Sequence, residues 1–227
     1  MAADRTLVVA TGNPGKVREL ERIIGDAVTL CLRHLGHYPE VGPIEETGST
    51  FEENAAIKAV EVTRITGHMA CADDSGLTVE ALHGAPGVHS ARYSGEDATD
   101  ERNNALLLER MQDVPEGERT GHFVCGCVLS VPAAWLGEVP VREGWERSPL
   151  NAEVFTWTGV ERVPGCLLRE PRGDEGFGYD PLFWYAPLKK TFAEMTVEEK
   201  NVISHRGLAF RRMVEELHWV LEEISEA

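Results

Sequence analysis

Two adjacent carboxylates, Asp73 and Asp74, follow the apolar run at residues 69–72 and precede Ser75 and Gly76. We interpret the apolar run as a short buried strand that ends at the acids. Neighbouring carboxylates repel each other and lose hydration there, and a cation or a shared proton relieves the repulsion. The pair therefore indicates a site for a hard divalent metal ion. The alternative, in which one Asp caps a turn and the other faces water, stays open at this point.

The segment TGNPGK at residues 11–16 joins the apolar run 6–10 to a stretch with apolar side chains at helical spacing. Asn13 suits the N-cap of that helix, and Pro14 suits its first position. The free N–H groups of a helix start, the adjacent glycines and the charge of Lys16 together favour a phosphate ligand. The spacing is shorter than that of the Walker P-loop. A plain strand-to-helix connection is the alternative.

The segment at residues 175–183, EGFGYDPLF, has a different chemistry. Glycines flank Phe177, which leaves a ring face free to stack on a planar ligand, and Asp180 can accept hydrogen bonds from ring N–H groups. Further along, His205 and Arg206 precede an amphipathic terminal helix, where their donors suit carbonyl or phosphate recognition. The alternative for residues 175–183 is a turn with aromatic side chains in the core.

The elements that must position these residues follow from local patterns. Residues 49–53 contain a hydroxyl followed three positions later by Glu, which predicts a capped helix start. Glu45 and Glu46 fall in the loop before that helix, where a carboxylate can point at a metal shared with the Asp pair; taken alone they are ordinary surface acids. Strict alternation predicts a strand at 123–131. Residues 133–152, rich in Pro and Gly, predict an irregular insertion.

Composition and charge narrow the class of protein. The chain has 227 residues, 42% of them hydrophobic, and a formal net charge of −16, which fits one sizeable globular unit. This charge, without a Lys/Arg-rich run, argues against binding polymeric nucleic acid. No apolar run approaches the ~20 residues that span a bilayer, and no signal peptide is recognisable, so we expect a cytoplasmic protein without a membrane partner. The five cysteines lack a CxxC pair and predict reduced thiols.

Six motifs, TGNPGK, EETG, ADDSG, GAPGVHSARYSG, GFGYDP and SHRG, occur in this order between Leu7 and Leu221. Together they resemble the inosine triphosphate pyrophosphatase family, in its bacterial dITP/XTP pyrophosphatase branch. The resemblance implies a single α/β domain over residues 1–227, with an elongated mixed β-sheet flanked by helices and two lobes with the active cleft between them. It also implies a homodimer. The implied activity is Mg²⁺-dependent hydrolysis of non-standard purine nucleoside triphosphates (ITP, dITP, XTP) to the monophosphate and pyrophosphate, which cleanses the nucleotide pool.

The resemblance also implies roles for residues. By this similarity Asp74 is the catalytic proton acceptor, and Glu45 and Asp74 bind Mg²⁺, while Asp73 and Glu46 stay open as further metal ligands. The choice of Asp74 over Asp73 rests on the resemblance and not on spacing. The implied substrate-binding residues are Thr11, Gly12, Asn13, Pro14, Gly15, Lys16, Ser75, Phe177, Gly178, Tyr179, Asp180, Lys200, His205 and Arg206.

The chemistry of these residues agrees with the implied reaction. Cleavage between the α and β phosphates needs an activated water, a base and positive charge on the leaving pyrophosphate. A 6-keto purine presents an acceptor to Lys200, His205 and Arg206, where adenine presents an amino donor. Two alternatives remain: a pyrophosphatase for modified pyrimidine triphosphates, and a nucleotide-binding regulator that does not hydrolyse its ligand.

The segment 135–150 is longer and richer in Pro and Trp than the same region in the family that the motifs resemble.

Overall fold

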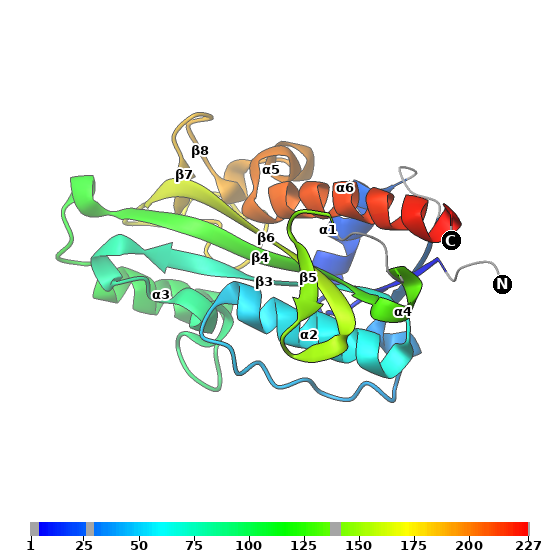
Figure 1. Ribbon diagram of the computed structural model, residues 1–227. Coiled ribbons are helices and arrows are strands. Elements are labelled where there is room, and N and C mark those ends of the chain that lie inside the picture. Colours follow the sequence, from blue (N-terminus) through cyan, green and yellow to red (C-terminus); the bar gives the residue numbers. More distant parts are fainter. Residues whose placement is uncertain (1–4, 26–29, 137–141, 227) are drawn as a thin grey trace. The chain divides into compact units, whose positions relative to one another are not determined.

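The computed structural model describes residues 5–25, 30–136 and 142–226 (Figure 1). Within these residues one eight-stranded sheet runs in the order β2-β1-β3-β4-β6-β7-β8, with β5 paired to β6. Helices flank this sheet, which confirms the predicted α/β class. The strands are β1 (Thr6–Val9), β2 (Cys31–His34), β3 (Met69–Val79), β4 (Thr120–Pro132), β5 (Trp145–Ser148), β6 (Asn151–Leu167), β7 (Phe183–Tyr185) and β8 (Lys190–Thr191). The α-helices are α1 (Pro14–Ile24), α2 (Phe51–Thr66), α3 (Asp100–Arg110), α4 (Ala133–Leu136), α5 (Val197–Ile203) and α6 (His205–Glu226).

The sheet is mixed. Strand β1 pairs in parallel with both β2 and β3, whereas β7 pairs antiparallel with β6 and with β8. All four residues of β1 are buried, as expected for a parallel strand that is covered on both faces.

The chain divides into two compact units. The first contains residues 1–74, 126–160 and 209–227, and the second contains residues 75–125 and 161–208. Strands β3, β4 and β6 and helix α6 each contribute residues to both.

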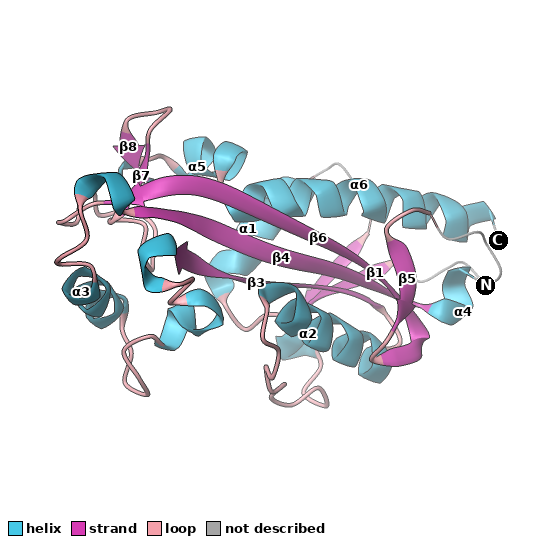
Figure 2. Ribbon diagram, turned by 60° about the vertical axis from the view of Figure 1, so that its left-hand side comes forward, coloured by secondary structure: helices cyan, strands magenta, loops and turns pink. Residues whose placement is uncertain are grey.

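In the first unit, helices cover both faces of the parallel strands. Figures 1 and 2 show α2 on one side of β1 and β3, and α1 and α6 on the other. On the α2 side, Ala55 and Ala59 pack in one cluster with Ala70 and Ala72 of β3. These small side chains let the helix approach the sheet closely, so polar atoms on that face of α2 can reach the strand.

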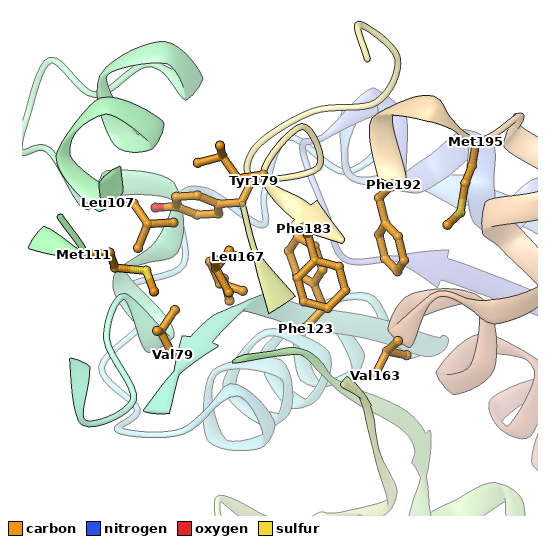
Figure 3. Close-up of a cluster of buried hydrophobic side chains, with 12 residues drawn as sticks. Val79, Leu107, Met111, Phe123, Val163, Leu167, Tyr179, Phe183, Phe192 and Met195 are labelled. Atoms are coloured by element: carbon orange, nitrogen blue, oxygen red, sulfur yellow. The ribbon is translucent and has the colours of Figure 1, made fainter. Parts of the chain in front are cut away.

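The second unit has an aromatic core (Figure 3). The ring of Phe123 on β4 lies 4.5 Å from that of Phe183 and 5.4 Å from that of Phe192. Tyr179 belongs to the same cluster, with Leu107 and Met111 beside it from the α3 region. This core anchors the segment that follows Gly178.

Three sequence predictions about elements are wrong. The apolar strand does not end at the acids, because β3 continues through Asp73 and Asp74 to Val79. Part of the predicted irregular insertion is ordered: within 133–152, α4 forms, and β5 pairs antiparallel with β6. The reason lies in Trp145, whose indole N–H donates to Glu216 at 2.9 Å and whose ring lies 5.4 Å from that of Trp219.

The third correction concerns the SHRG motif, which does not precede the terminal helix but begins it. Helix α6 starts at His205, so His205 and Arg206 lie in its first turn. The backbone N–H of Gly207 donates to the Ser204 hydroxyl at 3.0 Å, in the manner of an N-cap.

Two predicted helix starts are confirmed: Asn13 caps α1, and Thr50 and Glu53 form a capping box on α2. Thr196 and Glu199 form another capping box, on α5. All five cysteines lie in the described residues as free thiols. None of the helices in these residues combines the length and apolar character needed to cross a lipid bilayer.

The close approach of α2 to β4 gives a stability prediction. A Cβ added at Gly126 would lie 2.6 Å from the backbone nitrogen of Glu52. We expect Gly126→Ala to lower the free energy of unfolding by ~1–3 kcal/mol, because backbone atoms must move to relieve the clash. Urea denaturation measures this change. Gly117→Ala is the matched control, since a Cβ there meets nothing within 4 Å; equal stability of the two variants would contradict the packing described here.

Candidate active site

The turn between β1 and α1 presents the start of a helix. The Asn13 side chain accepts from the backbone N–H of Gly15 at 2.8 Å and of Lys16 at 3.4 Å. The Thr11 hydroxyl accepts from the backbone N–H of Asn13 at 3.1 Å. Gly12 and Asn13 are exposed, so the positive end of the helix dipole faces solvent. This geometry suits an anion such as phosphate.

The two acids of β3 point to opposite faces of the sheet, because side chains alternate along a strand. Asp73 faces α1, and its carboxylate lies 2.8 Å from the Lys16 ammonium. Asp74 faces α2, and its carboxylate accepts from the Asn54 amide at 2.9 Å. A cation held between the two carboxylates, which the sequence indicated, is therefore not the arrangement found.

Lys58 on α2 carries a second positive charge to the same strand. Its ammonium donates to the backbone carbonyl of Asp73 at 2.8 Å and lies 3.1 Å from the Glu46 carboxylate. The Lys16 ammonium also approaches that carbonyl, at 3.4 Å. Two lysines from different helices thus converge on one peptide group.

The environment of Asp74 favours a proton. Burial raises the pKa of its carboxyl, and the charge of Glu46 adds to the rise, while the Asn54 hydrogen bond and the charges of Lys58 and Lys16 oppose it; the pKa lies above its ordinary value. A carboxyl with a raised pKa is a better proton acceptor once it is ionised.

A hydrogen bond from the backbone of Gly48 fixes the orientation of the Asn54 amide. Its oxygen accepts the backbone N–H of Gly48 at 2.8 Å, which turns its N–H₂ group toward Asp74. A Cβ at Gly48 would lie 2.7 Å from that oxygen. Gly48, the glycine of the EETG motif, therefore positions Asp74 through Asn54.

The two glutamates of the EETG motif have different surroundings. Glu46 is half-buried and paired with Lys58. Glu45 is exposed and lines a hollow of about 600 Å³ with residues of α2 and the β5–β6 turn. The structure thus pairs Glu46 with Lys58, whereas Glu45 lines the hollow.

The donor set fits a hard cation. The described residues contain no group of three or more His, Cys, Asp and Glu side chains that could hold a metal. Mg²⁺ needs only one or two carboxylates when waters and phosphate oxygens complete its shell. The side chains that act on Asp74 are the Asn54 amide, the Glu46 carboxylate and the ammonium groups of Lys58 and Lys16, and a site with oxygen ligands suits Mg²⁺ better than Zn²⁺.

In the second unit, Phe177 lies beside two cations. The Lys200 ammonium is 4.9 Å from the centroid of its ring, and the Arg206 guanidinium is 5.5 Å from it. The ring is 42% exposed, whereas Lys200 is 9% and Arg206 4% exposed. Phe177 is thus an exposed aromatic surface supported by buried positive charge, which is suitable for stacking on a planar ligand.

Asp180 makes this charge possible. Its carboxylate forms a buried ion pair with Lys200 and accepts the backbone N–H of Phe177 at 2.9 Å. Burial raises the pKa of the Asp180 carboxyl, and Lys200 and Arg206 oppose that rise. A Cβ at Gly176 would clash with the carboxylate. Asp180 therefore pairs with Lys200 and also holds the turn through the backbone N–H of Phe177.

The remaining predicted residues occupy varied positions. Arg206 donates to the Ser75 hydroxyl at 2.8 Å, which joins the ADDSG and SHRG motifs. His205 is 5% exposed and stacks on Phe123 with ring centroids 4.8 Å apart. Tyr179 is buried, and its hydroxyl donates to the Ser90 carbonyl at 2.8 Å, so this ring lies in the core.

Sequence reasoning missed Asn54 and Lys58. Both lie on the face of α2 that packs on β3, four residues apart, where the other side chains are small and apolar. Polar residues at that spacing on an otherwise apolar helix face are the signal that would have found them.

Known proteins of one family resemble this chain over most of its length. The Ham1 family profile matches residues 7–216. This chain belongs to the Ham1 family. A relative from Geobacter sulfurreducens, named dITP/XTP pyrophosphatase, is 46% identical over 213 residues, covering 94% of this chain and 96% of the relative. A protein of the same name from Escherichia coli O157:H7 is 45% identical, covering 93% of this chain and 97% of that one.

Solved structures of the Ham1 family have the same fold. A HAM1 protein from Coxiella burnetii matches with a TM-score of 0.79 and 36% identity, covering 94% of this chain and 98% of that one. The Staphylococcus aureus Ham1 protein matches with a TM-score of 0.78 and 33% identity over the same shares.

The raised pKa of Asp74 predicts a pH-dependent stability. A raised pKa in the folded state contributes stability at low pH that is lost as the pH rises through that pKa. We therefore expect Asp74→Asn to have a higher free energy of unfolding than the native chain at pH 7. The difference should shrink toward pH 3, where the carboxyl is protonated in both states. Urea titrations in EDTA measure it, with the exposed Asp113→Asn as control; a less stable Asp74→Asn at pH 7 would contradict the burial cost.

Proposed function

We propose that this Ham1 family member hydrolyses ITP, dITP and XTP to the nucleoside monophosphate and pyrophosphate. The observation that carries the proposal is the acid–lysine group on β3, in which Asp74 is held by Asn54 while Lys16 and Lys58 converge on Asp73. Relatives at 46% and 45% identity bear the name dITP/XTP pyrophosphatase. The acid–lysine group supplies what cleavage of a phosphoanhydride needs: a proton acceptor beside fixed positive charge.

The first unit binds the phosphates in this proposal. The N–H groups at the start of α1 and the Lys16 ammonium hold the triphosphate, and Lys58 adds charge near the point of cleavage. The Asp74 carboxylate accepts the proton of the attacking water. Its hydrogen bond from Asn54 holds it in one orientation, so that little reorganisation accompanies the proton transfer.

We further propose Mg²⁺ as the metal, with Asp74 and Glu45 as its protein ligands. When bound, the ion would neutralise charge that develops on the phosphate oxygens. Glu45 supports this assignment because it is exposed, whereas Glu46 is already paired with Lys58.

Purine selection is assigned to the second unit. Phe177 offers a stacking surface, and Lys200, His205 and Arg206 offer donors to the 6-keto group. Adenine would leave those donors facing an amino group, at a cost of ~1–3 kcal/mol for each mismatched buried contact. In this proposal the surface is supported by four further residues, Ser75, Gly178, Tyr179 and Asp180.

By the same family resemblance we propose a cytoplasmic homodimer without a membrane or polymeric nucleic acid partner. The formal net charge of −16 supports exclusion of nucleic acid, because a polyanion meets repulsion outside a few basic positions.

Pyrophosphate release from ITP, XTP, GTP and ATP, with and without Mg²⁺, tests the proposal. We expect Mg²⁺-dependent release from ITP and XTP, and a ~10²–10⁴-fold loss of kcat in Asp74→Asn because the proton acceptor is gone. Equal turnover of all four would mean that the protein recognises phosphate alone. Faster turnover of modified pyrimidine triphosphates than of ITP would support a pyrimidine triphosphate pyrophosphatase. Binding of ITP without turnover would support a nucleotide-binding regulator.

The metal assignment has its own test. We expect Glu45→Gln to raise the Mg²⁺ concentration for half-maximal activity by ~10-fold or more, because a ligand is lost. Glu46→Gln is the matched control and should act mainly through Lys58, on kcat. A Mg²⁺ titration that shifts only in Glu46→Gln would transfer the ligand role to Glu46.

A further inference from the structure

The first turns of α3 hold the backbone of Gly178 from two directions. The Asp100 carboxylate accepts the Gly178 N–H at 2.6 Å. The Asn104 side-chain amide donates to the Gly178 carbonyl at 2.8 Å and to the Asp100 carbonyl at 2.9 Å. Both polar groups of one glycine are therefore bonded to side chains of one helix.

From this geometry we infer that Asp100 and Asn104 are positioning residues that set the orientation of Phe177 and thereby the selectivity for the purine base. We call the pair the Gly178 clamp. The inference rests on the proposed function, in which Phe177 stacks on the base, and it assigns a role to a helix that none of the predicted site residues belongs to.

Phe177 is held on its N-terminal side, where its backbone N–H donates to the Asp180 carboxylate at 2.9 Å, and the clamp holds the peptide on its other side. Gly176 and Gly178 on either side have left-handed backbones, with φ of +80° and +62°, and the segment between them lies outside the helices and strands. On its far side the turn is anchored, since Tyr179 is buried in the core beside Leu107 of α3 (Figure 3). The Phe177 ring is exposed and lies near Lys200 and Arg206, so the Asp180 bond and the clamp together define its position.

Asp100 is not needed for the helix itself. The N-cap of α3 is Thr99, whose hydroxyl accepts the backbone N–H of Arg102 at 3.3 Å. Glu101 supplies another acid in the first turn. The Asp100 carboxylate is thus directed to Gly178 in addition to a complete cap.

The two ends of the Asn104 side-chain amide differ in their hydrogen bonding. Its amide nitrogen makes two hydrogen bonds, whereas its Oδ1 is buried without a hydrogen-bond partner in the described part of the chain. A buried unsatisfied acceptor is costly in a native protein and calls for an explanation. Its donation to the Gly178 carbonyl, which fixes the turn, provides that explanation.

The experiment compares Asp100→Ala, Asp100→Asn and Asn104→Ala with the native chain and with Glu101→Gln, a matched control in the same turn. Kinetics with ITP and ATP give KM and kcat, and calorimetry gives the Kd of ITP. Inhibition by inorganic tripolyphosphate reports the phosphate side alone. Hydrogen exchange of residues 175–181 reports the clamp without any ligand.

We expect KM for ITP to rise ~10-fold or more in Asp100→Ala and Asn104→Ala, with kcat changed less than ~3-fold. The preference for ITP over ATP should fall, and residues 175–181 should exchange faster, while tripolyphosphate inhibition stays within ~2-fold of native. Asp100→Asn keeps an acceptor for the Gly178 N–H and should restore most of the KM. Glu101→Gln should match the native chain throughout.

Unchanged KM, selectivity and exchange in both Ala variants would overturn the inference. It would also fail if those variants lost tripolyphosphate inhibition and melting temperature together, since that marks a general structural role. A native chain that binds ITP without cleaving it would overturn the proposed function only, and the Kd values would then test the clamp in place of KM. A native chain that neither binds nor cleaves ITP would overturn both.

Discussion

The alternation of side chains along β3 is the constraint on which the acid–lysine group depends. Two neighbouring carboxylates could not both be buried on one face without a counter-ion between them. The strand sends them to opposite faces, where Lys16 from α1 meets one and Asn54 from α2 meets the other. Each helix must then approach β3 closely, which the alanines of α2 permit. The acids, the two helices and the packing between them therefore form one arrangement.

The second unit meets a comparable problem in another way. Lys200 and Arg206 are buried charges, and an uncompensated buried charge is strongly destabilising. Asp180 compensates Lys200 directly, and the Phe177 ring lies near both cations. The same carboxylate accepts the Phe177 N–H. One acid thus links the stability of the buried lysine to the position of the exposed ring, and this link explains why Gly176 tolerates no side chain on the side of Asp180.

Much of the fold and part of the site could be predicted from sequence, because caps and motifs are local. The cap at Asn13 and the boxes at Thr50 and Thr196 depend on side chains within three residues. The continuation of β3 through its acids could not be predicted, since it depends on partners about 20 and 57 residues away in sequence. The order of β5 likewise depends on Glu216, far along the chain. Sequence reasoning missed Asn54 and Lys58 because the capping box and the apolar face of α2 already explain why residues 51–66 form a helix.

The pairing of Lys16 with Asp73 also bears on how an anion is received. Two ammonium groups that converge on one carbonyl repel each other, and in a partly buried place that repulsion would push the side chains apart. The buried Asp73 carboxylate balances this repulsion, because it lies 2.8 Å from the Lys16 ammonium. In the proposed function, a phosphate at the start of α1 would therefore meet a lysine whose ammonium is already held in place. Less side-chain freedom would be lost on binding than if Lys16 were unrestrained.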